Sequence, residues 1–211
     1  MQKFRKEYSE VGIDFEQMAA DPFTQFGQWF DEAAQVGMIE PNGMTLSTVD
    51  GDGRPSGRIV LLKAWDSRGF IFYTNFESRK GLELAQNPYA SLTIWWREQE
   101  RQVRIEGQIE KATDEESDAY YNSRPRESRL GAWASPQSQQ VDGRHVLEAK
   151  FEEMKSRFPA DQPLPRPEFW GGYRLVPDMF EFWQGRRSRL HDRMVFRLQE
   201  DNSWDLVRLA P

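Results

Sequence analysis

Five short apolar segments between residues 44 and 110 constrain the fold of this chain more than any other feature. They are MTLSTV, GRIVLLKAW, GFIFYTN, YASLTIWW and RQVRIEGQIE, and turn sequences such as DGDG, DSRG and NP separate them. Short runs rich in β-branched and aromatic residues are typical of β-strands. Most of the connections are too short for the crossover helices that a parallel sheet needs. We therefore expect an antiparallel barrel.

Helical patterns flank these strands. Apolar residues recur at helical spacing from Phe23 to Ala33, behind Asp21 as a plausible N-cap. Further helices are expected at SRKGLELAQN, DEESDAYYNSR, ESRLGAWAS and HVLEAKFEEMKSRF, and strands at MFEFWQG, RMVFRLQ and WDLVRLAP. We expect one α+β domain over residues 21–211, preceded by a polar N-terminal arm over residues 1–20.

Composition excludes several kinds of function. The net charge of -6 argues against a nucleic-acid partner, because such a partner requires a field that attracts phosphates. No cysteine is present, which rules out a thiolate nucleophile, a disulfide framework and cysteine-based metal sites. The two histidines, His145 and His191, show no zinc-ligand spacing. No stretch approaches the ~20 apolar residues of a membrane span. We expect a cytoplasmic protein without a metal.

Familiar nucleotide and calcium motifs are absent as well. No GxGxxG follows a strand, and no GxxxxGK[ST] occurs. The glycines around Asp50 and Asp52 resemble a calcium loop, but Arg54 stands at the fifth position. A hairpin turn is the better interpretation of this segment.

Two cations follow the expected N-cap Ser78. Arg79 and Lys80 fall in the first turn of the helix, where positive charge opposes the helix dipole. An anion such as a phosphate at this helix start would explain the placement. The alternative is a pair of solvated surface cations.

A second pair of cations, Arg58 and Lys63, brackets the apolar run of GRIVLLKAW. Their odd separation places them on opposite faces of a regular strand, so they would serve different ligand groups or simply extend to water. In RQVRIEGQIE the residue Gln102 points outward, toward either a planar polar ligand or solvent.

The segment DAYYNSRPRESRLGAW offers a third polar cluster. Tyr120 and Arg124 lie four residues apart on one helical face, and Ser128 falls in the first turns of the next helix, after Pro125. These three side chains would form a phosphate cradle. An exposed Tyr/Arg pair beside an ordinary helix start is the alternative.

The segment RLHDR near the C-terminus is the most distinctive. If it is extended, Arg189, His191 and Arg193 point to one face over about 13 Å of strand. Their mutual repulsion would favour an anion or an electron-rich ring there, and Trp183 offers a stacking surface. The alternative is an edge strand protected by charge.

Taken together, a series of ordered blocks across the chain resembles the pyridoxine/pyridoxamine 5′-phosphate oxidase family. The blocks are RIVLLK, FYTNFESRK, ERQVRIEG, YYNSRPRES, GAWASPQS, FWGGYR, EFWQGRRSRLHDR and RLAP. The resemblance implies a split β-barrel that binds FMN and a homodimer with FMN at the subunit interface. The residues that it implies as FMN contacts are Arg58, Ile59, Val60, Leu61, Leu62, Lys63, Tyr73, Thr74, Arg79, Lys80, Gln102, Gln137, Ser138, Trp183 and Arg193.

The same resemblance implies how the substrate binds. Lys63, Tyr120, Arg124 and Ser128 would hold its 5′-phosphate, Arg189 and His191 would contact its pyridine ring as the catalytic pair, and Arg5 and Tyr8 would belong to a lid. No role carries over to Arg186 or Arg187. The implied reaction oxidises pyridoxamine or pyridoxine 5′-phosphate to pyridoxal 5′-phosphate, with O2 as electron acceptor, H2O2 as product and ammonia released from the amine.

Two other functions stay open at this point. One is a different split-barrel flavin reductase or oxidase with the same cofactor residues. The other is a non-catalytic module that binds FMN or pyridoxal phosphate. The presence of both residue sets, for cofactor and for substrate, favours the oxidase.

Overall fold

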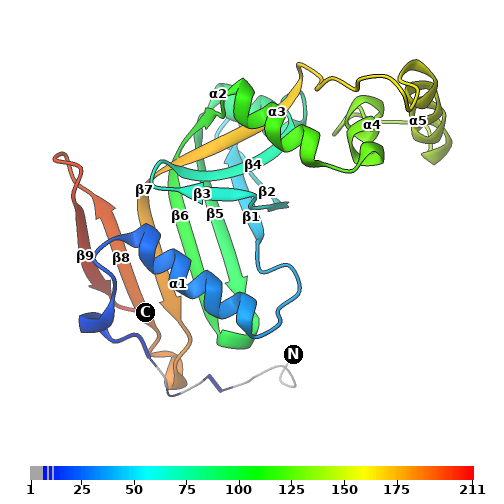
Figure 1. Cartoon of the computed structure of the whole chain (residues 1–211). Helices are drawn as coiled ribbons and strands as arrows, with labels where there is room; N and C mark the ends of the chain where they lie inside the picture. The colour runs from blue at the N-terminus through cyan, green and yellow to red at the C-terminus, as the bar shows by residue number, and fades with distance from the viewer. Residues whose placement is uncertain (1–6, 9, 11) are drawn as a thin grey trace.

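Nine β-strands form one sheet in the part of the chain that the structure, a computed structural model, describes: residues 7, 8, 10 and 12–211 (Figure 1). The strands are β1 (Gly43–Val49), β2 (Pro55–Leu61), β3 (Ala64–Asp66), β4 (Gly69–Asn75), β5 (Tyr89–Trp96), β6 (Arg101–Lys111), β7 (Trp170–Gln184), β8 (Asp192–Leu198) and β9 (Trp204–Leu209). Every pairing described between them is antiparallel, which confirms the predicted type of sheet.

The sheet curls into a split barrel because one long strand pairs with three others. The strand order is β2-β1-β5-β6-β7-β4-β3, and β8 and β9 extend the sheet from β7. The first half of β7 pairs with β4 and its second half with β8, while β6 lies along nearly its whole length. A register shift at Gly107 bends this pair, and a Cβ there would lie 2.0 Å from the Val176 carbonyl oxygen.

The segment GRIVLLKAW is not one strand as predicted. It divides into β2 and β3, and the break falls at Leu62 and Lys63. The Leu62 amide donates to the Asn42 carbonyl, whereas the Lys63 amide donates to the Ile71 carbonyl. The hydrogen-bond partner of the backbone therefore changes between these two residues, from the segment before β1 to β4. Burial of Leu62 in the core turns the backbone, so the regular alternation of faces ends there.

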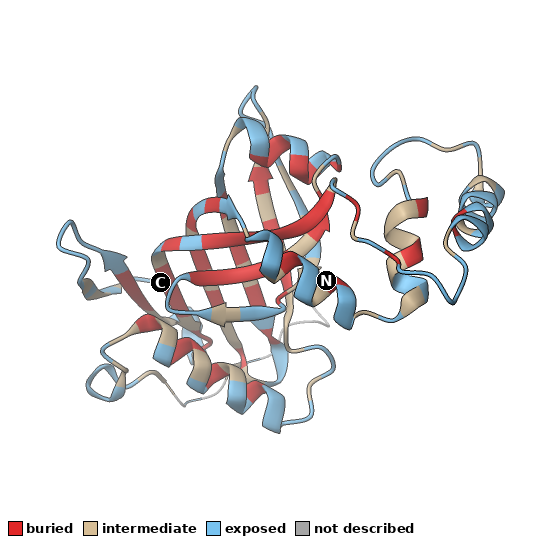
Figure 2. Ribbon diagram, turned by 45° about the horizontal axis from the view of Figure 1, so that its top comes forward, coloured by how far each residue is buried: buried red, intermediate tan, exposed pale blue. Residues whose placement is uncertain are grey.

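The barrel core is aromatic and is covered on one side by α1 (Pro22–Gln35). The carboxylate of Asp21 accepts from the Thr24 amide and caps this helix, as predicted. Phe26 is fully buried, with its ring centroid 4.9 Å from that of Phe70. Figure 2 shows the buried residues along the strands and on the side of α1 that faces them.

Four further helices lie at the other end of the barrel (Figure 1). They are α2 (Arg79–Gln86), α3 (Asp114–Ser123), α4 (Arg126–Ala134) and α5 (Arg144–Arg157). The last two stand away from the sheet and share a small core of their own, built from Leu130, Ala134, Met154 and Leu164. No helix among the described residues is long and apolar enough to cross a membrane.

Short 3-10 turns complete the fold at Phe15–Gln17, Arg97–Gln99 and Arg187–Arg189. The last of these overturns the prediction that RLHDR is extended. Ser188 and Arg189 have φ angles of 56° and 61°, so the chain turns there, and β8 begins only at Asp192. Arg189 and His191 therefore do not share a strand face with Arg193. The loop closes a β7–β8 hairpin, and pairing of the flanking strands overrides the extended propensity of the segment.

Candidate active site

A cavity of about 360 Å³ is lined by residues from β2, β4, β7, α2 and α3 and from the loops between elements. Its lining residues are Arg58, Ile59, Val60, Leu61, Lys63, Tyr73, Thr74, Lys80, Tyr120, Arg124, Gln137 and Trp170. All of them except Trp170 were predicted from the sequence to bind cofactor or substrate. Four carry a positive charge and none is acidic, so the cavity favours an anionic ligand.

Lys80 is the most deeply placed of these cations. Ser78 caps α2, as predicted, and the buried ammonium of Lys80 donates to Thr74 Oγ1 at 3.0 Å, Ser78 Oγ at 3.1 Å and Gln137 Oε1 at 3.0 Å. All three acceptors are neutral. Burial, together with the nearby Arg58 charge, lowers the pKa of Lys80 to about 8. A bound anion would offset the cost of this buried charge.

Arg58 and Lys63 reach the same cavity, although a regular strand would have placed them on opposite faces. The break at Leu62 and Lys63 removes the alternation on which that expectation rested. The two cations therefore face one cavity.

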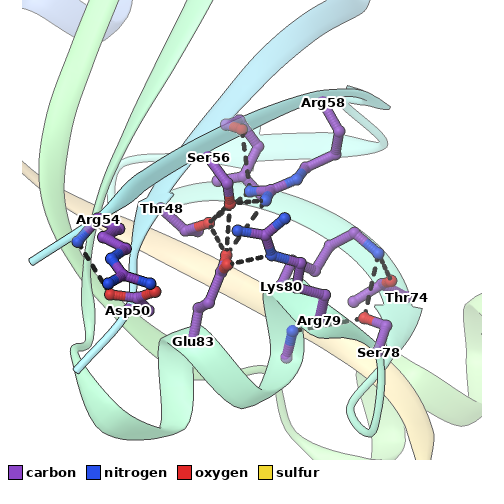
Figure 3. A network of polar contacts seen from close by, with 12 residues as sticks. Thr48, Asp50, Arg54, Ser56, Arg58, Thr74, Ser78, Arg79, Lys80 and Glu83 are labelled. Carbon is purple, nitrogen blue, oxygen red and sulfur yellow. Dashed lines mark hydrogen bonds and ion pairs between the residues drawn. The ribbon is translucent and has the colours of Figure 1, made fainter. Parts of the chain in front are cut away.

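A buried carboxylate, Glu83 on α2, organises the cation network next to the cavity (Figure 3). Glu83 Oε2 accepts from Ser56 Oγ at 2.7 Å and Arg58 Nη2 at 3.1 Å, and it also accepts from Thr48. Its other oxygen accepts from Arg79 Nε at 2.8 Å. Burial by itself raises the pKa of Glu83, but these hydrogen bonds and the Arg58 charge outweigh it and lower the pKa to about 2.

The helix-start cations of α2 thus have different environments. Lys80 is buried and reaches the cavity, whereas the exposed side chain of Arg79 pairs with Glu83 one turn along the helix. Arg79 is therefore not simply a solvated cation, and an anion beside Lys80 stays a prediction.

Three aromatic rings form one wall of the cavity. Tyr73 stacks on Tyr120 with ring centroids 3.9 Å apart, and it lies nearly parallel to Trp170 at 5.7 Å. Gly172 makes room for this arrangement, because a Cβ there would lie 2.9 Å from the Tyr73 ring. Lys63 Nζ lies 5.9 Å from the Tyr120 ring centroid.

Arg124 follows α3 and stacks on Trp170, one of these three rings. Its guanidinium carbon lies 4.7 Å from the Trp170 ring centroid. Its Nη1 atom is buried and has no hydrogen-bond partner. Burial lowers the pKa of Arg124. A buried donor without an acceptor is costly, so this nitrogen is suited to an anionic ligand.

A second group of predicted residues forms a row across the sheet rather than part of this cavity. Gln102 on β6 lies opposite Trp183 on β7, which lies opposite Arg193 on β8. Arg193 is not free, since Glu181 accepts from its Nε at 2.8 Å and its Nη2 at 3.1 Å. Glu181 is buried and also pairs with Arg104.

His191 lies beside this row. Its ring centroid is 4.6 Å from that of Trp183 and 5.4 Å from that of Tyr8 in the N-terminal arm. Its Nδ1 atom accepts from the Arg186 amide at 3.0 Å, so the proton of the neutral ring belongs on Nε2. Burial and the Arg189 charge lower the pKa of His191. Both effects favour the neutral form of the ring.

The remaining predicted residues lie elsewhere. Leu62 is in the barrel core, and Ser128, Ser138 and Arg189 are exposed and do not line the cavity. Arg5 lies outside the described residues. Arg186 and Arg187, to which the resemblance gave no role, pair with Asp192 and Glu10 respectively.

Sequence reasoning missed three residues that organise the site: Trp170, Glu83 and Glu181. The spacing of Glu83 from Arg79 suits an ion pair on a helix, so a signal was present. Trp170 and Glu181 fall within family blocks, FWGGYR and EFWQGRRSRLHDR, but their roles depend on strands that are distant in sequence, so the blocks alone assigned them none.

The fold and the cavity define a class: a split-barrel protein with a cationic cavity suited to an anionic ligand. Two family models match the chain, pyridoxamine 5′-phosphate oxidase over residues 30–158 and the pyridoxine 5′-phosphate oxidase C-terminal dimerisation region over residues 170–211.

Similar proteins carry the same description. The pyridoxine/pyridoxamine 5′-phosphate oxidase of Cupriavidus necator is 58% identical over 98% of this chain and 97% of its own length. That of Gloeothece citriformis is 51% identical over 98% of this chain and 96% of its own length. The chain belongs to the pyridoxine/pyridoxamine 5′-phosphate oxidase family.

Solved structures agree with this fold. PhzG from Burkholderia lata, solved with tetrahydrophenazine-1-carboxylic acid, is 32% identical and superposes with a TM-score of 0.87 over 96% of this chain and 100% of its own. A pyridoxamine 5′-phosphate oxidase-related, FMN-binding protein from Nostoc punctiforme has a TM-score of 0.72 at 17% identity, over 92% of this chain and 100% of its own. The latter similarity shows the fold alone.

Proposed function

We propose that this protein is an FMN-dependent oxidase that converts pyridoxamine 5′-phosphate and pyridoxine 5′-phosphate into pyridoxal 5′-phosphate. One observation carries the proposal: a cavity with four cations, no acidic lining residue and a buried arginine nitrogen without a partner. A phosphorylated ligand supplies the missing negative charge and the missing hydrogen-bond acceptors.

The cavity residues fit the phosphate end of FMN. The buried Lys80 ammonium, whose partners are all neutral, and the Arg58 guanidinium would bind that phosphate, with the neutral side chains of Thr74 and Gln137 nearby. When bound, FMN would accept two electrons from the substrate and pass them to O2, giving H2O2. The protein's contribution is then binding, orientation and exclusion of water.

Lys63, Tyr120 and Arg124 would bind the substrate's 5′-phosphate. All three residues line the cavity, and Arg124 Nη1 is available to an anionic oxygen. Ser128 is exposed on α4, and its part in phosphate binding stays a prediction.

Arg189 and His191 would contact the pyridine ring from a second copy of the chain. Within one chain they lie in the β7–β8 loop, and neither lines the cavity. The match to a C-terminal dimerisation region supports an interface that includes this loop. A neutral His191 with its proton on Nε2 would donate a hydrogen bond to the ring.

The N-terminal arm would cover the bound substrate. Tyr8 already contacts both Trp183 and His191, next to the position assigned to the ring. Closure of such an arm would keep water from the reacting atoms. The division into an arm over residues 1–20 and a single domain over residues 21–211, like the cytoplasmic location, stays a prediction.

Anaerobic reduction tests the proposed function. The purified protein is expected to bind FMN and turn yellow, to lose its colour when pyridoxamine 5′-phosphate is added without oxygen, and to regain it in air with formation of H2O2. Unphosphorylated pyridoxamine at the same concentration should bleach it far more slowly. A protein that binds no FMN refutes the flavin proposal. One that binds FMN but is not bleached is a reductase of another kind or a non-catalytic module.

A further inference from the structure

Arg124 differs from three other arginines of the predicted site, Arg58, Arg79 and Arg193. Arg58 and Arg79 share the buried carboxylate of Glu83, and Arg193 pairs with the buried carboxylate of Glu181. Among the described residues, no carboxylate forms an ion pair with Arg124. Its guanidinium rests instead on the face of Trp170.

An aromatic face and a carboxylate hold a guanidinium in different ways. A carboxylate consumes N–H donors and cancels the charge, so it competes with an anionic ligand. An aromatic face attracts the cation through its π electrons and leaves the N–H groups at the edge unused. Arg124 Nη1 is buried without a partner, as this second mode predicts.

Trp170 is itself firmly held. The residue is 7% exposed, its ring lies nearly parallel to those of Tyr73 and Tyr120, and it meets the Tyr121 ring edge-on at 5.3 Å. Its carbonyl oxygen accepts from Arg166 Nη1 at 2.7 Å. The ring therefore provides a fixed surface at the cavity wall.

We infer that Trp170 is a positioning residue: its ring orients the Arg124 guanidinium toward the substrate's phosphate without neutralising its charge. Trp170 thereby sets the preference for phosphorylated over unphosphorylated substrate. The inference rests on the proposed function, which assigns that phosphate to Arg124. The inference assigns a role to a residue to which the sequence resemblance gave none. It also places recognition of the substrate's phosphate at Arg124, apart from binding of the FMN phosphate at Lys80.

Steady-state kinetics of the FMN-loaded protein test this inference. In Trp170→Leu the KM for pyridoxamine 5′-phosphate is expected to rise about tenfold, the effect of losing one desolvated cation–π contact. The kcat value and the FMN content should stay close to those of the wild type. The KM for unphosphorylated pyridoxamine should not change, so the preference for the phosphorylated substrate falls by the same factor. Trp170→Phe keeps an aromatic face and should restore most of the affinity.

Trp29→Leu is the matched control. Arg101 stacks on Trp29 with its guanidinium carbon 4.3 Å from the ring centroid, and Trp29 does not line the cavity. This variant loses a similar contact and some stability, but the ratio of the two KM values should stay that of the wild type. If Trp170→Leu does not fold, Trp170→Met keeps a flexible apolar side chain there and should show the same loss of preference.

Binding of inorganic phosphate to the FMN-loaded protein, measured by calorimetry, separates the two proposals because it requires no turnover. Phosphate should bind Trp170→Leu about tenfold more weakly than wild type. If wild type oxidises pyridoxamine 5′-phosphate but Trp170→Leu matches it in KM and in phosphate affinity, the role of Trp170 is wrong. If wild type does not oxidise the substrate, the proposed function fails, and the difference in phosphate affinity still decides whether Trp170 positions Arg124.

Discussion

Lys80 is a buried ammonium group, and its charge should make the stability of the FMN-free protein depend on pH. Burial lowers its pKa from 10.5 to about 8 in the folded state. Below pH 8 both folded and unfolded chains carry the proton, and the buried charge destabilises the fold. Above pH 8 the folded chain releases the proton while the unfolded chain retains it up to 10.5. The free energy of unfolding must therefore rise with pH in this window.

The magnitude follows from the two pKa values. Between about pH 7 and about pH 9.5 the contribution of Lys80 to the free energy of unfolding grows by about 2 kcal/mol. Urea unfolding of FMN-free wild type and Lys80→Met at these two pH values measures it. The wild type should gain about 2 kcal/mol more than the variant, which lacks the titrating group. Lys150→Met removes an exposed lysine of α5 and should gain as much as the wild type.

Equal gains in wild type and Lys80→Met would refute the reasoning, because they would mean that Lys80 keeps its proton in the folded state throughout this range. Addition of inorganic phosphate offers a further check. An anion near the ammonium raises the pKa of Lys80, so the excess gain of the wild type should shrink when phosphate is bound.

Two further predictions concern other titrating groups. Glu83→Gln should destabilise the protein by about 3 kcal/mol at pH 7, because the pKa of Glu83 is lowered from 4.5 to about 2 in the folded state. Urea unfolding measures this difference, which should disappear as the pH falls from 4.5 to about 2. The control Glu148→Gln breaks an exposed helical ion pair and should cost at most about 0.5 kcal/mol. Arg189→Ala removes a nearby positive charge and should raise the pKa of His191; an NMR titration with the His145 resonance as internal reference measures this, and an unchanged midpoint for His191 would contradict it.

Local patterns in the sequence predicted the elements that depend on neighbours along the chain. The caps Asp21 and Ser78 start their helices as expected, because capping uses amides within three residues. The inward alternation of Val103 and Ile105 on β6 holds, since the side-chain period of a strand is two. The two failures have tertiary causes: the chain changes strand partner at Leu62 and Lys63, and the β7–β8 pairing turns the chain at Ser188 and Arg189.

For the candidate site, too, the sequence determined some features and the tertiary structure decided others. The sequence by itself determined that most of the cavity residues are polar or cationic and fall near the ends of strands and helices, and the family blocks grouped them. Only the tertiary structure decided which cations are neutralised. Pairing of β6, β7 and β8 places Glu181 beside Arg193, whereas the start of β7 brings Trp170, not a carboxylate, against Arg124. A charge partner depends on which strands become neighbours, and contacts between residues far apart in the chain decide that.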